Sequence, residues 1–78
     1  MLNEERLKII LEKYFERNHL IFEGAYPIKE NGERKMIIRV FGKKGNFLMK
    51  MGNDGKLWCQ SLKGNWFLIE SYKVNSDG

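Results

Sequence analysis

The first part of the chain spaces its hydrophobic residues with the period of an α-helix. Residues three or four positions apart fall on one stripe of a helix from about 3 to 18. The stripe consists of Leu7, Ile10, Leu11, Tyr14 and Phe15. Asn3 suits an N-cap, and the acidic Glu4 and Glu5 suit the positive end of the helix dipole. We therefore predict an amphipathic helix whose stripe packs on a core.

Beyond residue 20 the hydrophobic period changes to two, which is typical of β-strands. We predict five strands, at about 20–26, 35–41, 46–51, 56–62 and 66–73. Every connector carries Gly and three of the four carry Asn, residues that accept the positive φ of tight turns. Pro27 cannot donate to a ladder, so it should end the first strand or lie on a sheet edge. The short connectors favour an antiparallel meander.

The turns divide the predicted sheet into two faces. If the turn at 42–45 sets Phe41 opposite Asn46, one face gains only apolar residues, namely Met36, Ile38, Val40, Phe47, Met49 and Met51. A three-residue turn with left-handed Gly55 adds Leu57 and Cys59 to this face. The alternative two-residue turn would place Gln60 in the core. With a last loop at 63–65, Phe67 and Ile69 point inward, and Trp66, Leu68 and Glu70 point outward.

One helix can cover only one face of such a sheet. The opposite face would hold apolar and aromatic residues, namely Ile37, Phe41, Leu48, Trp58, Leu62, Trp66 and Leu68, among Arg39, Lys50 and Glu70. This is too much apolar area for a fully solvated sheet, and the composition is typical of interfaces.

Length and composition fit this arrangement. The chain has 78 residues, of which 42% are hydrophobic and 31% are charged, as in a folded globular protein. We expect an α+β fold in a single small domain, 1–78. The N-terminal amphipathic helix, about 3–18, packs on one face of a four- or five-stranded antiparallel meander sheet, about 20–73. A frayed tail follows at 75–78.

Charge is unevenly distributed along the chain. The net charge is +4, with −2 up to Glu33 and +6 from Arg34 onward. Eight basic residues lie in a stretch whose only acid is Asp54, namely Arg34, Lys35, Arg39, Lys43, Lys44, Lys50, Lys56 and Lys63. Basic strands with interleaved aromatics resemble single-strand nucleic-acid binders. Lysines at hairpin tips also guard sheet edges against aggregation, so the pattern is not specific.

Little in the sequence points to catalysis. The single cysteine, Cys59, and the single histidine, His19, fall on different elements, and no paired Cys or His has metal-ligand spacing. We therefore predict no enzyme activity, no catalytic residue, no cofactor and no metal. No apolar run approaches a membrane span, the first residues are acidic where a secretory signal is basic, and a lone cysteine suits a reducing compartment. These features predict a soluble, cytoplasmic protein.

The function that these observations favour is a small non-catalytic binding or regulatory module. It would act through its sheet face or edge on a protein partner, which includes a second copy of itself. The predicted interaction surface comprises Ile37, Arg39, Phe41, Lys43, Lys44, Leu48, Lys50, Trp58, Trp66 and Leu68. The alternative is a nucleic-acid-binding protein that uses the basic strands and hairpin tips of residues 34–63. In its size and in its use of Lys, Asn and Ile, the chain resembles the small accessory regulators of low-GC bacteria and their phages.

Overall fold

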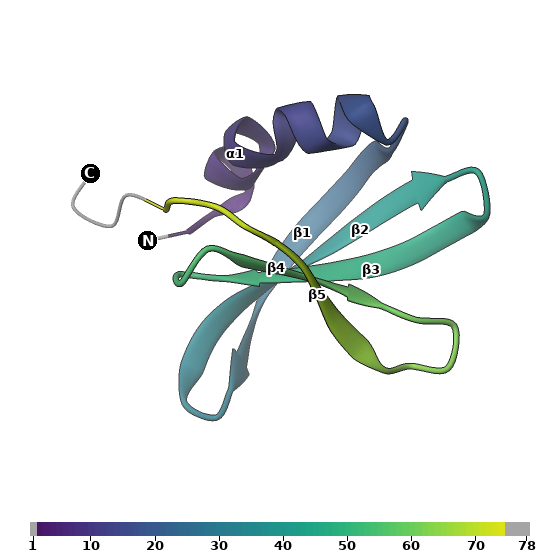
Figure 1. Ribbon diagram of the computed structural model, residues 1–78. Coiled ribbons are helices and arrows are strands. Elements are labelled where there is room, and N and C mark those ends of the chain that lie inside the picture. Colours follow the sequence, from purple (N-terminus) through teal and green to yellow (C-terminus); the bar gives the residue numbers. More distant parts are fainter. Residues whose placement is uncertain (1, 75–78) are drawn as a thin grey trace.

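The computed structural model describes residues 2–74 and shows one helix on a five-stranded antiparallel sheet (Figure 1). The elements are α1 (Glu4–Arg17), β1 (Ile21–Glu30), β2 (Glu33–Gly42), β3 (Gly45–Gly52), β4 (Lys56–Gln60) and β5 (Trp66–Ser71). The strands lie in the sheet in chain order, each antiparallel to the next. The predicted α+β fold with a meander sheet is confirmed. The predicted tail at 75–78 lies outside the described residues.

Helix α1 begins and ends within a residue of the prediction. The side chain of Asn3 accepts a hydrogen bond from the Arg6 amide at 2.9 Å, which satisfies one of the free amides of the first turn. Leu7, Leu11 and Phe15 are buried, so the predicted stripe is the face that meets the sheet. Because these residues recur every four positions, one narrow face of the helix covers the core.

Two turns show why the hairpins have their register. Asn31 and Gly32 both have positive φ, 53° and 80°, as a two-residue hairpin turn requires. Gly55 has a φ of 79° and closes the predicted three-residue turn, since its amide donates to the Gly52 carbonyl at 3.0 Å. A Cβ at Gly55 would overlap the carbonyl of Tyr72, so the position also requires glycine for space.

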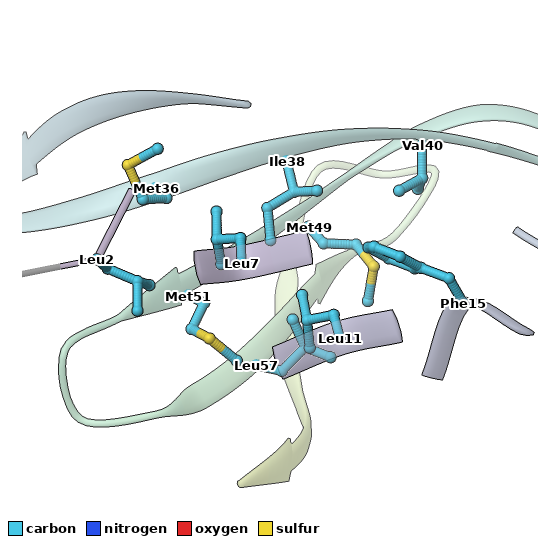
Figure 2. Packing of buried hydrophobic residues seen from close by; sticks show 10 residues of the cluster. All are labelled: Leu2, Leu7, Leu11, Phe15, Met36, Ile38, Val40, Met49, Met51 and Leu57. Carbon is cyan, nitrogen blue, oxygen red and sulfur yellow. The ribbon is translucent and has the colours of Figure 1, made fainter. Parts of the chain in front are cut away.

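The predicted register of the central strands is confirmed. Phe41 lies opposite Asn46, and Met51 lies opposite Leu57. The core therefore forms on the face that α1 covers, and Figure 2 shows its side chains gathered between the helix and the sheet. Its buried residues are Leu2, Leu7, Leu11, Phe15, Met36, Ile38, Val40, Met49, Met51 and Leu57. Of these, only Leu2 lies outside the predicted elements.

The first strand is longer than the sequence predicts. β1 continues through Pro27 to Glu30, because Pro27 lies in an edge strand and needs no partner on its outer side. Of the two roles predicted for Pro27, the edge position is therefore the correct one.

The last hairpin differs from the prediction in two ways. β4 ends at Gln60, which pairs with Trp66, so residues 61–65 form the connection. This shift of two positions leaves Trp66 and Leu68 on the expected face. A bulge at Ile69 then changes the alternation, and Glu70 lies opposite Leu57 on the helix side, with Arg17 at 3.2 Å. The predicted outward position of Glu70 is therefore wrong.

No helix among residues 2–74 is both long enough and apolar enough to cross a membrane.

The core assignment predicts the cost of single truncations. Leu11→Ala or Ile38→Ala removes a side chain with no exposed surface, and each should lower the free energy of unfolding by about 2 to 5 kcal/mol. Ile9→Ala is the matched control on the same helix, since Ile9 is 75% exposed and its loss should change stability little. Chemical denaturation measures all three. Equal stability of Leu11→Ala and Ile9→Ala would contradict the packing of α1.

Candidate functional site

The face of the sheet turned away from α1, called the far face here, carries most of the residues predicted to form an interaction surface. Cross-strand pairs join Ile37 to Lys50, Lys50 to Trp58, and Trp58 to Leu68. By the same alternation this face includes Arg39, Phe41, Leu48 and Trp66. Lys43 and Lys44 lie in the exposed turn between β2 and β3. Register thus groups these residues as predicted.

The centre of the far face is closed by its own side chains. Ile37 and Lys50 are each only 6% exposed, although both were predicted to meet a partner. The Lys50 ammonium lies 2.9 and 3.1 Å from the two carboxylate oxygens of Glu30, and 4.4 Å from the ring centre of Trp66. These partners come from β1 and β5. The turns of the β1–β2 and β4–β5 hairpins bend away from α1, so the twisted sheet curls over this face (Figure 1).

Glu30 is the anion that balances the two central lysines. Lys50 and Lys35 both contact its carboxylate, the latter at 3.4 Å. The hydrogen bond from Lys50 is the main cause that holds the pKa of Glu30 below its usual value, and Lys35 adds to it. Two basic residues of the predicted positive surface are therefore paired within the protein. Arg39, Lys43 and Lys44 remain exposed.

The sheet opens between β3 and β4. Strand β3 has eight residues, but only Met49, Lys50 and Met51 pair with β4. Residues 45–48 pair with β2 alone among the described residues. The β2–β3 and β4–β5 hairpins therefore diverge, as seen at the right of Figure 1. We call the space between residues 45–48 and the 61–65 connection the fork.

The free edge of β3 points its backbone groups into the fork. The Gly52 carbonyl accepts from Gly55, so this side of Gly52 faces β4. In a strand every second residue directs its N–H and C=O to the same neighbour. Lys50, Leu48 and Asn46 therefore face the β4 side with Gly52, but only Lys50 has a paired residue there.

A groove of about 390 Å³ occupies the fork on the helix side of the sheet, beyond the end of α1. It is lined by Leu20, Gly42, Lys43, Lys44, Asn46, Phe47, Cys59, Gln60, Ser61, Leu62 and Phe67. Phe67 is 51% exposed and Leu62 is fully exposed, so the groove presents an apolar wall to solvent. None of the lining residues is acidic, and Lys43 and Lys44 stand at one side.

A small cleft of about 130 Å³ adjoins the groove. It is lined by Glu23, Arg39, Asn46, Phe47 and Leu48, and it shares Asn46 and Phe47 with the groove. The cleft lies over β1, β2 and β3, and no residue of β4 or of the 61–65 connection lines it.

The sequence prediction missed the groove because it took the single helix to cover the whole apolar face of the sheet. Phe47, Cys59 and Phe67 were assigned to the face under the helix, and Leu62 to a strand. The signal that could have revealed the groove is length, since a 14-residue helix spans about 21 Å and its narrow stripe cannot cover five strands. Lys43 and Lys44 are the predicted site residues that line it.

No family model, curated protein or solved structure matches the chain. Within residues 2–74, no group of three His, Cys, Asp or Glu side chains is placed to hold a metal ion. The geometry of the fork and of the far face is therefore the basis for any functional argument.

Cys59 is a chemical reporter inside the groove. It is the single cysteine of the chain, and burial raises the pKa of its thiol above the usual 9.0. The thiolate is the reactive form, so at neutral pH the folded protein should react with a maleimide more slowly than the denatured chain. The rate should still be rising with pH at the usual thiol pKa. Mass spectrometry follows the reaction, and equal rates for folded and denatured protein would contradict the partial burial of the Cys59 thiol.

The Lys50–Glu30 pair gives a pH-dependent prediction. Glu30→Gln leaves the buried Lys50 ammonium without its carboxylate, which should lower the free energy of unfolding by about 1 to 3 kcal/mol at neutral pH. Glu33→Gln is the control, because Glu33 is exposed and lies directly opposite Glu30.

Since the pKa of Glu30 is lowered by folding, its charge stabilises the protein above the usual carboxyl pKa. This contribution is lost as the pH falls through the lowered pKa. Denaturation across acidic pH should therefore show wild type and Glu30→Gln converging. A difference that persists unchanged in strong acid would contradict the ion pair.

Proposed function

We propose that the protein is a non-catalytic binding module that takes a protein partner through its sheet, at the fork. The observation that carries this proposal is the free edge of β3 beside an apolar groove. A strand edge with no partner and an exposed apolar wall are two features that folded proteins normally cover. A bound partner would cover both, so the fork is the part of the structure that gains most from binding.

The groove favours binding over chemistry. Its titratable side chains are Lys43, Lys44 and the Cys59 thiol, and none of its lining residues is a carboxylate or a histidine. Burial disfavours the reactive thiolate of Cys59. A nucleophile with a base and an orienting group is the usual minimum for catalysis, and the lining residues do not supply that set.

A protein partner is favoured over nucleic acid because of how the basic and aromatic side chains are used. Lys35 and Lys50 are paired with Glu30. The Trp66 ring is in contact with the Lys50 ammonium, which occupies a surface on which a base would stack. Nucleic-acid binding by the exposed lysines is the alternative function. A cytoplasmic location is still a prediction from the sequence.

Panning of a random peptide library on the immobilised full chain tests the proposal. Wild type should enrich peptides that lose binding to Phe67→Glu, because a charge in the groove wall opposes burial of apolar side chains. Ile9→Glu is the control, since Ile9 is exposed on the outer side of α1. Both variants are first checked for a wild-type thermal melt. The absence of enriched peptides, or peptides that bind Phe67→Glu equally well, would contradict the proposal.

The same preparations distinguish the alternative. At low salt the protein should bind labelled single- and double-stranded oligonucleotides no more tightly than an unrelated protein of the same net charge does. An affinity that falls steeply with salt and is lost in Lys43→Glu would favour nucleic acid instead.

A further inference from the structure

We propose that the fork binds an extended, acidic segment of the partner, which pairs as an added strand with the free edge of β3 and inserts an apolar side chain into the groove. This inference rests on the proposed function and specifies the chemistry of the partner. It follows from three independent features of the fork: its backbone, its charge and its shape.

The backbone of residues 45–48 is already in strand geometry, although in the described part of the chain it pairs only with β2. Residues 45–48 are held straight by their pairing with β2 from Gly42 to Arg39. Their outer N–H and C=O groups repeat at the spacing that another strand would match. Addition of a strand to such an edge gives main-chain affinity with little ordering cost on the protein side.

The charge of the fork selects an anionic segment. Lys43 and Lys44 line the groove, and Lys63 lies in the connection that forms its other side. Neither lysine of the turn takes part in an ion pair among the described residues. Acidic side chains on the partner strand would neutralise these cations, whereas a basic strand would be repelled.

The groove supplies a place for an apolar anchor. Side chains alternate along an added strand, so every second one would point toward the groove side of the sheet. Phe47, Cys59 and Phe67 form the apolar walls there, and the volume of about 390 Å³ lies within the range of ligand pockets. An aromatic or aliphatic residue flanked by acidic residues is therefore the expected motif.

The experiment uses three labelled peptides that differ only in charge. Each alternates valine with a second residue and has phenylalanine at its centre, and the second residue is aspartate, serine or lysine. Fluorescence anisotropy measures affinity for the full chain, and the labelling rate of Cys59 reports whether the peptide occupies the groove. The aspartate peptide should bind at least tenfold more tightly than the lysine peptide and should slow the labelling of Cys59.

Variants assign the contacts. Lys43→Glu combined with Lys44→Glu should weaken the aspartate peptide roughly tenfold, as expected for two exposed charge pairs. Lys56→Glu is the control, because this exposed lysine lies at the other end of β4. An aspartate peptide with N-methyl groups on alternate backbone amides tests strand pairing. Binding should be lost when the methyl groups lie on the amides that point toward β3. It should be kept when they lie on the amides that point away from β3.

The outcomes separate this inference from the proposed function. Equal binding of the three peptides, with Cys59 protected by each, would overturn the acidic preference but leave a binding module at the fork. Equal binding of both methylated forms would overturn strand addition. Binding by none of these peptides and by no library peptide would overturn both proposals. Sedimentation of wild type as a dimer that Lys43→Glu with Lys44→Glu dissociates would make a second copy the occupant and overturn the inference.

Discussion

The structure depends on the limited reach of a single helix over a five-stranded sheet. α1 buries three residues of its stripe against the middle of one face. Residues 2–74 contain no second helix that could cover the rest of that face. The sheet compensates through twist, which brings Glu30 of β1 and Trp66 of β5 to the Lys50 ammonium of β3. The centre of the far face is thereby covered by a paired charge and an aromatic ring in place of an apolar second layer, while Phe41 and Leu68 stay exposed.

The same twist explains why the sheet opens. β1 pairs with β2 along its whole length. β3 pairs with β2 on one side and with β4 on the other, and the β2–β3 and β4–β5 hairpins bend in different directions. It pairs with β4 over three residues and then diverges, which leaves a stretch of strand with one neighbour. The outer edges of the sheet are treated differently. At β1, Pro27 has no N–H, and Glu4 of α1 accepts from the Ala25 amide at 3.3 Å. At β5, the bulge at Ile69 interrupts the ladder. The fork lies inside the sheet, where neither device acts.

Sequence pattern predicted the parts of this structure that depend on alternation. The helix, the five strands, the pairing of Phe41 with Asn46 and the left-handed Gly55 all follow from local periods and turn residues. Patterns of period two assign a residue to a face, but they contain no information on how far that face is curled. The burial of Ile37 and Lys50 depends on that curl, and the side chain that pairs with Lys50 lies on β1, 20 residues away in sequence. The bulge that moves Glu70 toward Arg17, and the early end of β4, are likewise set by tertiary packing. Lys43 and Lys44 could be predicted as exposed, but the groove beside them could not.

Both proposals depend on residues 45–48 of β3 having no paired neighbour on the β4 side among residues 2–74. Native-state amide hydrogen exchange followed by NMR tests it residue by residue. Asn46, Leu48 and Lys50 point their amides to the same side of the strand, and only Lys50 faces a paired residue there. The amides of Asn46 and Leu48 should exchange many times faster than those of Lys50 and Phe47, because the Phe47 amide is directed to β2. Equal, strong protection of Asn46, Leu48 and Lys50 in the free protein would show that the fork is closed and that β3 has no free edge there.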